Sequence, residues 1–524
     1  MVRLVEALKP EHHGKIYEFL RQHGRGYTNG ALPEHVSALF AFFLMLSFYS
    51  WLGIYGWRRL GKLSTVPALA SALWVVLVLG WFGGGLELLL SGWHVPLLLL
   101  LGGFGALTSN FQGEDHTYSM VERDAAAGAP AAPTAVLEAT GMDRAIVVAC
   151  AGGGIQAAAW SAQVLEGLHD LHGEKFERAL RMISGISGGS MGSVCYVNWL
   201  PSVKGMAAEL SPTVRKPSEA AKDSSLDEVA WGLAWPDLLR TMVPFFFGRM
   251  PDRADAMEKA WCGNATILNR LDSKHRELTA PLSQWNAKTA SGDLPALVMN
   301  STMVELGGPL LMGTTDVVSG TGLPLNLWIS GDELHQESGG TKKMDVTAVR
   351  AARLSATFPY VTPVARPAKA DKRQPHMIDG GLFDNSGMAT ASAWLDQALA
   401  GSEKIRNVLV IQVTGFPPNQ FQMPADTRSG WWKQIAAPME VLVSGRVAGQ
   451  TSHGEIEMKL LREKWKEKNV AIEEVTFSYS MDQKKQPPLS WHLTPREREE
   501  ISLAWDSSCE EARKAVADFL AAET

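Results

Sequence analysis

The sequence predicts an α/β domain with a mostly parallel central sheet, preceded by an N-terminal region of transmembrane helices. Three observations support this fold class. Three long uncharged apolar runs lie within the first 110 residues. Beyond them, short apolar runs bounded by glycine alternate with stretches of helical periodicity, the order expected of parallel strands joined by helices. One short run ends in a serine crowded by glycines, Gly185-Ile186-Ser187-Gly188-Gly189, which is typical of a sharp strand-to-helix turn.

The composition limits the classes of function. The chain has 524 residues, enough for about three domains. A formal net charge of −6, without a long basic stretch, gives no reason to expect nucleic acid as a partner. The four cysteines, at 150, 195, 262 and 509, form no C-x-x-C pair. This argues against a disulfide scaffold or a thiolate metal site and fits a reducing compartment.

The N-terminal apolar runs cover residues 36–57, 66–86 and 88–108. Crossing the hydrocarbon core takes about 20 apolar residues, so each run qualifies by length. Only Glu87 separates the second run from the third, which leaves two or three spans within a transmembrane region at 36–110. Residues 1–35 are then a cytoplasmic or interfacial segment.

The orientation depends on how the third run crosses. Arg58, Arg59 and Lys62 follow the first run directly, and positive charge favours a cytoplasmic loop. A re-entrant hairpin of the second and third runs would keep the C-terminal part in the cytoplasm with this loop. The free cysteines favour the cytoplasm, so we expect a multi-pass protein of the plasma (inner) membrane.

Residues 111–142 are rich in Ala, Pro and acidic side chains, which predicts a linker. Residues 143–524 then form the α/β domain. A capping box from Thr494 to Glu497 predicts a C-terminal helix. The other expected elements are strands at 144–151, 181–184, 294–302 and 408–414, and helices at 190–199, 345–355 and 388–400.

An insertion is expected at about 201–293, where a polar stretch is followed by Trp231, Trp235 and an apolar run at 242–247 with Met250. One interpretation is a cap that packs on the core. The other is a lid or lipid-facing surface beside an active site.

Ser187 is the candidate nucleophile. The G-x-S-x-G pattern lifts the serine hydroxyl above the sheet, and the small neighbours Gly185 and Gly189 allow close approach of a substrate. A serine hydroxyl in such a turn forms and breaks acyl esters when a base takes its proton.

Gly152-Gly153-Gly154 joins a strand to a helix, where unpaired N–H groups could hold a developing oxyanion. A tight turn or a phosphate loop is the alternative. Neither the Walker A pattern nor G-x-G-x-x-G is present, which argues against a nucleotide site.

Asp379 is the candidate base. It ends a short apolar run and precedes Gly380 and Gly381. An Asp-Gly-Gly sequence alone is usually a turn. Its significance comes from its occurrence together with the elbow and the triglycine loop.

These three motifs resemble those of the patatin-like phospholipases over residues 145–400. The resemblance implies a three-layer α/β/α domain and a Ser–Asp dyad of Ser187 and Asp379. It also implies an oxyanion hole at Gly152, Gly153 and Gly154. In the mechanism that we expect, the amide of Gly188 adds a further donor to this hole. The segment 355–359 resembles the Phe-Pro segment that precedes the aspartate in that family.

One departure from the family pattern lies in the glycine-rich loop. The family's loop usually begins with aspartate and carries a basic residue and a further glycine, where this chain has Ala151, Gln156 and Ala157. Gln156 offers no cation for a phosphate, although its amide can donate hydrogen bonds. The departure affects the expected head-group preference more than the expected hydrolysis.

Two alternatives remain open. An α/β-hydrolase triad would add an imidazole from His453 or His492, whereas His376 is expected to be a local polar residue. A catalytically idle module that binds lipid or protein is the non-enzymatic alternative. An intramembrane serine protease is set aside because Ser187 lies far beyond the last apolar run.

The favoured function is a membrane-anchored serine acyl-ester hydrolase of the phospholipase, lysophospholipase or lipase type. Its substrates would be membrane lipids, and the bilayer would be its partner. No motif implies a metal ion or an organic cofactor, and the sequence identifies no protein partner.

Overall fold

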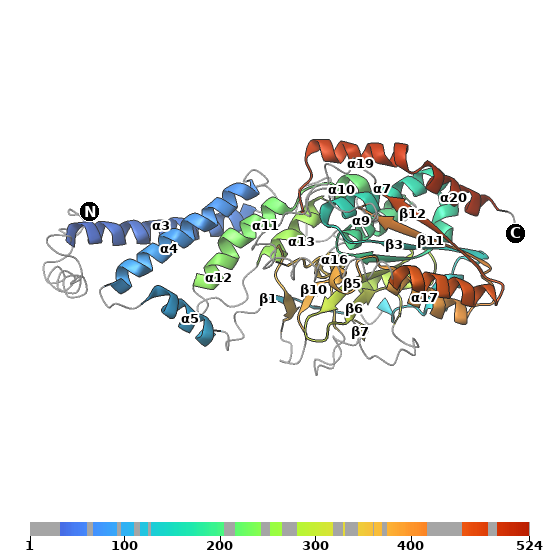
Figure 1. The fold of residues 1–524 in the computed structure, drawn as a ribbon, viewed down its shortest axis with the longest axis horizontal. Helices are drawn as coiled ribbons and strands as arrows, with labels where there is room; N and C mark the ends of the chain where they lie inside the picture. The colour runs from blue at the N-terminus through green and yellow to red at the C-terminus, as the bar shows by residue number, and fades with distance from the viewer. Residues whose placement is uncertain are drawn as a thin grey trace, which may run out of the picture. The chain divides into compact units, whose positions relative to one another are not determined.

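The computed structural model describes residues 32–59, 67–91, 96–108, 116–123, 127–203, 215–242, 252–264, 280–317, 329–330, 344–359, 361–368, 375–416, 453–479 and 490–522. The chain divides into two compact units, drawn as a ribbon in Figure 1. Unit 1 comprises Met1–Asp115 and Asp227–Ala256, and unit 2 comprises His116–Leu226 and Met257–Thr524.

The described residues in the first part of unit 1 form three apolar helices, α3 (Leu32–Arg59), α4 (Ala68–Ser91) and α5 (Leu97–Thr108). The predicted runs at 36–57 and 66–86 lie within or overlap the first two. The third run is divided, because residues 88–91 extend α4 and Pro96 directly precedes α5. Proline cannot donate to the preceding helical turn, so it starts a new helix. With 12 residues, α5 is about 18 Å long, which is shorter than a hydrocarbon core of about 30 Å.

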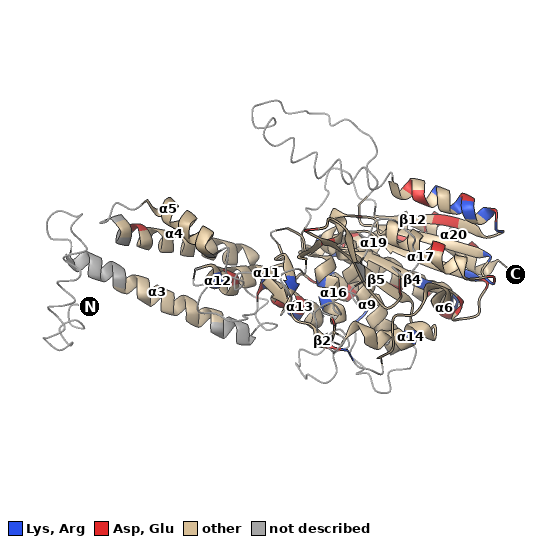
Figure 2. Ribbon diagram, turned by 90° about the horizontal axis from the view of Figure 1, so that it is seen from below, with Lys and Arg blue, Asp and Glu red and all other residues tan. Residues whose placement is uncertain are grey.

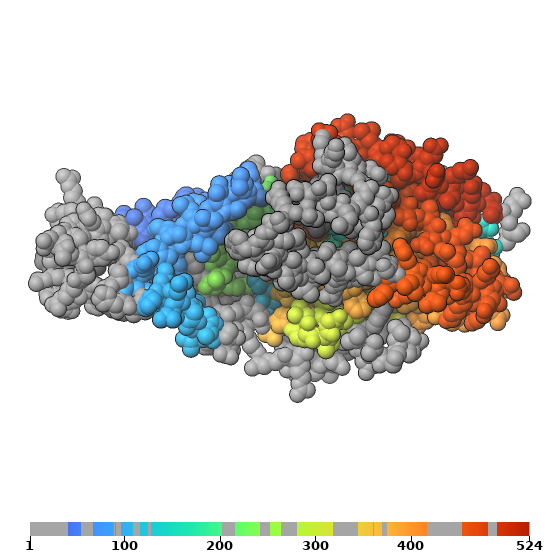
Figure 3. All heavy atoms as spheres, in the orientation of Figure 1, coloured from blue at the N-terminus to red at the C-terminus, as the bar shows by residue number. Residues whose placement is uncertain are grey.

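Among the described residues, one helical segment is long and apolar enough to cross a bilayer, Ala68–Glu87 of α4. Only 11% of its most apolar 18-residue window is buried, and Leu69 and Val76 are 71% and 68% exposed. Figure 2 shows α4 and α5 almost without charged residues, and Figure 3 shows their atoms at the surface of unit 1. Phe40–Gly53 and Leu97–Leu107 are apolar but shorter. Length and composition therefore indicate α4 as the candidate span.

Residues 227–256 belong to unit 1 rather than to the α/β unit. The π-helical turn η4 (Leu233–Asp237) lies between α11 (Leu226–Gly232) and α12 (Leu238–Met242). Trp235 stacks on Tyr49 and on Trp74, with ring centroids 6.2 Å apart in both pairs. The Tyr49 hydroxyl donates a hydrogen bond to the carbonyl of Ala234 at 2.5 Å.

The insertion expected at 201–293 is therefore divided between the two units. Its tryptophans at 231 and 235 pack in the aromatic core of unit 1. The apolar residues 243–247 and Met250 lie outside the described residues, so the lid or cap interpretation remains a prediction.

The central sheet of unit 2 is mostly parallel, as the sequence predicts. Its strand order over the described residues is β1-β9-β10-β5-β4-β3-β11-β12, and β6 and β7 continue from β5. The five strands from β5 to β12 in this order run parallel, whereas β10 and β6 are antiparallel to β5. The bounds are β1 (His116–Tyr118), β3 (Arg144–Cys150), β4 (Leu180–Ile186), β5 (Ala296–Met303), β6 (Pro309–Gly313), β7 (Ile329–Ser330), β9 (Ala365–Pro367), β10 (Met377–Asp379), β11 (Asn407–Thr414) and β12 (Ala471–Ser478).

The strand order reverses between β3 and β11. From β3 the chain adds β4 and β5 on one side, and it later adds β11 and β12 on the other. Ligands of open α/β sheets bind beyond the carboxyl ends of strands at such a switch point. The topology thus marks the end of β3, where the triglycine loop begins.

Helices cover both faces of this sheet (Figure 1). One face carries α7 (Gly154–His172), α9 (Gly188–Val203), α10 (Pro217–Ala221) and α19 (Pro495–Ser508). The other carries α6 (Pro133–Glu138) and α17 (Met388–Ala400). Every residue of β3 is buried, and alternate residues such as Val147 and Ala149 pack with Trp394 of α17. Burial along a whole strand is typical of a parallel sheet covered on both sides.

The prediction of a linker at 111–142 is wrong for those residues of the segment that the structure describes. They form β1, the two-residue strand β2 (Val121–Glu122) and α6. Leu137 of α6 is fully buried, and Tyr118 of β1 is 2% exposed. The Ala- and Pro-rich composition hid these few large apolar side chains, whose burial fixes the segment to the sheet and to α17.

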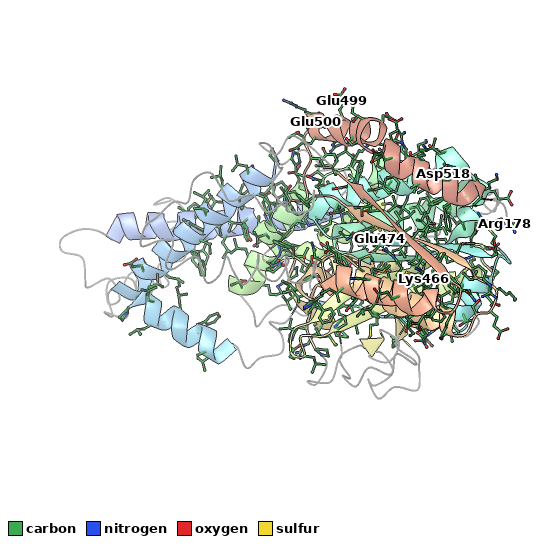
Figure 4. All side chains as sticks on the ribbon, turned by 45° about the vertical axis from the view of Figure 1, so that its right-hand side comes forward. Arg178, Lys466, Glu474, Glu499, Glu500 and Asp518 are labelled. Carbon is green, nitrogen blue, oxygen red and sulfur yellow. The ribbon has the colours of Figure 1, made fainter. Side chains whose placement is uncertain are left out.

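Charged side chains protect the outer strand β12. Its partner is β11, and Glu473 and Glu474 are exposed on it. Figure 4 labels Glu474 together with charged residues of α19 and α20 (Glu510–Ala521) on the surface of unit 2. Such charges hinder pairing of an exposed edge with another chain.

Candidate active site

Ser187 lies in a strained turn between β4 and α9. Its φ of 50° is in the left-handed region, which among the described non-glycine residues only Asn469 shares. A non-glycine residue in this region costs roughly 1–3 kcal/mol and persists only where its surroundings impose it. The G-x-S-x-G motif therefore forms the elbow that the sequence predicts.

The glycines around Ser187 allow close backbone contacts. A Cβ on Gly188 would overlap the carbonyl of Gly154, and one on Gly189 would lie 2.7 Å from the carbonyl oxygen of Ala151. A Cβ on Gly185 would lie 2.7 Å from Cα of Ser190. The elbow is thus pressed against the loop that follows β3, and no larger side chain fits at these three positions.

Asp379 lies at the end of β10 and faces Ser187. The Ser187 hydroxyl donates a hydrogen bond to Oδ2 of Asp379 at 2.7 Å, although the two residues are 192 positions apart. Oδ1 of Asp379 accepts from the amide of Gly381 at 2.8 Å. Both side chains are buried, with 5% and 4% exposed. A Cβ on Gly380 would overlap the carbonyl of Asn300 on β5, so this glycine lets the aspartate loop lie against the sheet.

Burial raises the pKa of Asp379 to about 6, because it disfavours the charged carboxylate. The hydrogen bonds from Ser187 and Gly381 act in the opposite direction and stabilise the charge. A carboxylate with this pKa is mostly ionised at neutral pH and is basic enough to accept a proton.

The triglycine loop lies beside the elbow. A Cβ on Gly152 would be 3.3 Å from Cβ of Ser187. Gly153 and Gly154 have φ values of 145° and 59° and start α7. The N–H groups of Gly153, Gly154 and Gly188 have no hydrogen-bond acceptor among the described residues. These amides can hold an oxyanion that forms next to Ser187.

The sequence assigns Gly152 to the oxyanion hole, but the structure gives its amide another partner. Its N–H donates a hydrogen bond to the carbonyl of Asn385 at 2.9 Å and is therefore occupied. A Cβ at this position would also overlap Oδ1 of Asn385. Gly152 thus shapes the loop by its small size rather than by donating to a substrate.

Gln156 does not face the site as a donor. Its side-chain amide donates to the carbonyl of Gly415, beyond the end of β11, and the residue is 5% exposed. This contact ties α7 to β11 at the switch point. The position that is basic in the family therefore has an internal structural contact in this chain.

The two histidines considered for a triad, His453 and His492, have other surroundings, and so does His376. His376 pairs with Glu305 at 2.5 Å, and His492 contacts the hydroxyl of Ser224 at 3.2 Å. His453 is exposed at the start of the helical residues 453–466. Within the described part of the chain, Ser187 and Asp379 bond to each other directly and no imidazole lies between them.

Sequence reasoning gave no separate role to Ser355, the last residue of α16 (Ala348–Ser355). The Ser187 amide donates to the Ser355 hydroxyl at 3.0 Å. The resemblance marked only the segment that begins there, because a contact across 168 residues leaves no local pattern.

Among the described residues, no group of three or more His, Cys, Asp or Glu could hold a metal ion.

No curated protein matches this chain in sequence. Among solved structures, it is similar to VipD from Legionella pneumophila, with 11% identity, 76% of this chain and 70% of that chain covered, and a TM-score of 0.27. It is also similar to the structure of full-length SpcU in complex with full-length ExoU from Pseudomonas aeruginosa. That match has 16% identity, covers 61% of this chain and 52% of that chain, and has a TM-score of 0.20.

The family comparison covers the site itself. Residues 148–392 match the model of the family described as patatin-like phospholipase, and this range includes the triglycine loop, the elbow, α16 and Asp379. The chain therefore contains a patatin-like phospholipase domain over residues 148–392.

Proposed function

We propose that this chain is a serine acyl-ester hydrolase of lipids that acts through a dyad of Ser187 and Asp379. The observation that carries the proposal is the 2.7 Å hydrogen bond from the Ser187 hydroxyl to Asp379, at a strained elbow beside amides that have no acceptor in the described part of the chain. The family of residues 148–392 supports lipids as the substrate class.

In the acylation step, Asp379 takes the proton of Ser187 while the serine oxygen attacks the acyl carbonyl carbon. Negative charge moves to the carbonyl oxygen, where the amides of Gly153, Gly154 and Gly188 are available to donate. The tetrahedral intermediate then collapses. The alcohol leaves with the proton from Asp379, and the acyl group stays on Ser187.

In the deacylation step, Asp379 takes a proton from water, and the resulting hydroxide oxygen attacks the acyl-enzyme carbonyl. The same amides stabilise the second oxyanion. Collapse releases the fatty acid, and the proton on Asp379 returns to Ser187. One carboxylate thus serves as base and acid in both halves of the reaction.

We further propose that α4 anchors the enzyme in a membrane. The exposed apolar surface of Ala68–Glu87 supports an anchor. Anchoring would keep the site near substrates that stay in the bilayer.

The free cysteines favour a cytoplasmic catalytic domain at the plasma (inner) membrane. Protease added outside sealed, right-side-out membrane vesicles should then leave unit 2 intact. Cleavage of unit 2 without lysis would contradict this orientation.

The direct test of the activity is fatty-acid release from phospholipid vesicles by the full-length protein. Wild type should release fatty acid, and Ser187→Ala and Asp379→Asn should each lower the rate at least 100-fold, the scale of lost acid–base catalysis. His453→Ala and His492→Ala are the matched controls and should keep the wild-type rate. A collapse in either histidine variant would favour a triad, and an inactive, folded wild type would favour a lipid- or protein-binding module.

A further inference from the structure

The backbone amide of Ser187 depends on a side chain from another element. At the elbow this N–H donates to Oγ of Ser355 at 3.0 Å. Ser187 is 5% exposed and Ser355 is fully buried, so water cannot readily replace the bond. Because the φ of Ser187 is unfavourable, an acceptor at this point helps to hold the residue in its turn.

The hydroxyl of Ser355 makes three hydrogen bonds, and these fix its orientation. It donates its proton to the carbonyl of Asn300 on β5 at 2.5 Å. The hydroxyl of Ser190, 2.8 Å away, must therefore donate to Ser355. A hydroxyl has one proton and two lone pairs, and all three are engaged here. Ser355 thus joins the elbow to the first turn of α9 and to the sheet.

The same turn of chain also holds Asp379. The Asp379 amide donates to the carbonyl of Thr357 at 3.0 Å, only two residues beyond Ser355. The Thr357 hydroxyl donates back to the carbonyl of Arg353 in α16 at 3.0 Å. One short segment therefore touches the backbone of both dyad residues, which are far apart in sequence.

Ion pairs fix the helix that ends in this segment. Glu258 of α13 (Arg253–Asn264) accepts from Arg350 at 2.7 Å and from Arg353 at 3.0 Å. Arg353 and Glu258 are 2% and 6% exposed. The Thr347 hydroxyl caps the other end of α16 by accepting from the amide of Arg350 at 3.4 Å. These contacts hold α16 along its length and so fix the position of its last turn, which carries Ser355.

We propose that Ser355 is a positioning residue for the nucleophile, and that the turn from Ser355 to Thr357 sets the distance between the Ser187 hydroxyl and Asp379. The assignment rests on the proposed function. It predicts that Ser355 affects kcat and not only the stability of the folded protein.

The test compares Ser355→Ala with Ser193→Ala in the full-length protein. Ser193 is equally buried and its hydroxyl donates to the carbonyl of Gly189 at 2.7 Å, whereas no hydrogen bond joins its side chain to Ser187 or Asp379 in the described structure. Steady-state kinetics on p-nitrophenyl butyrate give kcat and KM, and thermal unfolding gives stability. Ser355→Ala should lower kcat about 10- to 100-fold with KM within about twofold of wild type, as expected when a reacting atom is displaced. Ser193→Ala should lose comparable stability and keep kcat.

Two further variants keep the proposal testable if Ser355→Ala does not fold. Ser355→Thr retains an oxygen acceptor, whereas Ser355→Cys has nearly the same shape with a weak acceptor. Thr should retain kcat within about threefold of wild type, and Cys should show the 10- to 100-fold loss.

An unchanged kcat in folded Ser355→Ala, or equal kcat losses in Ser355→Ala and Ser193→Ala, would overturn the positioning role while leaving the proposed function intact. Equal kcat in the Thr and Cys variants would overturn it as well. A folded wild type without esterase activity would overturn the proposed function and this assignment together.

Discussion

Asp379 is the residue whose physical state matters most for the site. Its carboxylate is 4% exposed and accepts hydrogen bonds from Ser187 and Gly381. Burial raises its pKa to about 6, and the two donors keep the pKa from rising further. The residue is thus charged at neutral pH in surroundings that disfavour charge, a balance often found where a carboxylate acts as a base.

The pH dependence of activity follows from this pKa. The base must be ionised, so kcat/KM on a soluble short-chain ester should be constant above about pH 7 and should fall below about pH 6, approaching tenfold per pH unit. Initial rates between pH 4.5 and 8.5 would measure the profile. A profile that stays flat down to pH 5 would contradict the assignment of Asp379 as the base.

The free energy of unfolding should change with pH in the opposite direction to activity. The pKa of Asp379 is raised on folding from 3.8 to about 6, so the folded state binds more protons between these values and loses stability as pH rises through that window. Asp379→Asn removes this effect. It should stabilise the protein at pH 8 by up to roughly 3 kcal/mol.

Urea unfolding of wild type and Asp379→Asn at pH 8 and pH 5 gives the comparison. At pH 5 most wild-type molecules hold a neutral Asp379, so the gain should be much smaller. A gain of equal size at both pH values would show that ionisation of this residue does not cause it.

At the scale of elements, the site is formed by four chain segments that meet at the carboxyl end of the sheet. They are the loop after β3, the elbow after β4, the turn after α16 and the loop after β10. Each approaches another through glycine or a small residue. The contact between Gly188 at the start of α9 and Gly154 at the start of α7 is the tightest of these, because a Cβ there would overlap a carbonyl.

Gly188→Ala should therefore force these two helices apart. We expect a loss of about 1–3 kcal/mol in the free energy of unfolding, the scale of overpacking, together with a loss of activity. Gly263→Ala in α13 is the matched control, because among the described atoms outside its own helix backbone none lies within 4 Å of a Cβ there. It should change stability by less than about 0.5 kcal/mol. Equal effects in urea unfolding would contradict the close packing of the elbow.

Much of this arrangement follows from local patterns. The helix predicted at 388–400 is α17, the strand predicted at 408–414 is β11, and the capping box at Thr494 and Glu497 is present at the start of α19. Continuous apolar runs, glycine boundaries and caps are local features, so a single sequence reveals them.

Contacts between distant segments could not be predicted. The amide of Gly152 donates a hydrogen bond to the carbonyl of Asn385, and the side-chain amide of Gln156 donates to the carbonyl of Gly415. The role of Ser355 depends on three partners in other elements. The helix predicted at 345–355 starts later, because Asp345 pairs in the strand β8 (Met344–Asp345) with Val121. Tertiary hydrogen bonds decide these details, and sequence spacing does not encode them.

At the scale of the molecule, the two units differ in chemistry. The α/β unit has a covered sheet and a charged surface, whereas α4 and α5 of unit 1 have exposed leucines, with Leu98 at 83% and Leu69 at 71%. Apolar area of this extent is costly in water and is expected to be covered by lipid. The proposed function joins these units as an anchor and a hydrolase.

The anchor can be tested by substitution within α4. The double variant Leu73→Arg/Val76→Arg puts two charges in the middle of the candidate span, where insertion of each costs about 2.5–3.5 kcal/mol. Its full-length protein should become extractable from membranes by alkaline carbonate, while wild type stays in the pellet. The control Leu503→Arg changes an exposed leucine of α19 in unit 2 and should leave the protein in the pellet. Extraction of wild type itself would contradict a membrane span.

The central claim is that the Ser187 hydroxyl is a nucleophile activated by Asp379. Mass spectrometry of the full-length protein after treatment with a fluorophosphonate tests it most directly, because the reagent reports a covalent bond at the reacting atom. We expect one adduct per chain, mapped to the peptide that contains Ser187, absent in Ser187→Ala and at least 100-fold slower to form in Asp379→Asn. An adduct on another residue, or one that forms on Ser187 at the same rate without the aspartate, would contradict it.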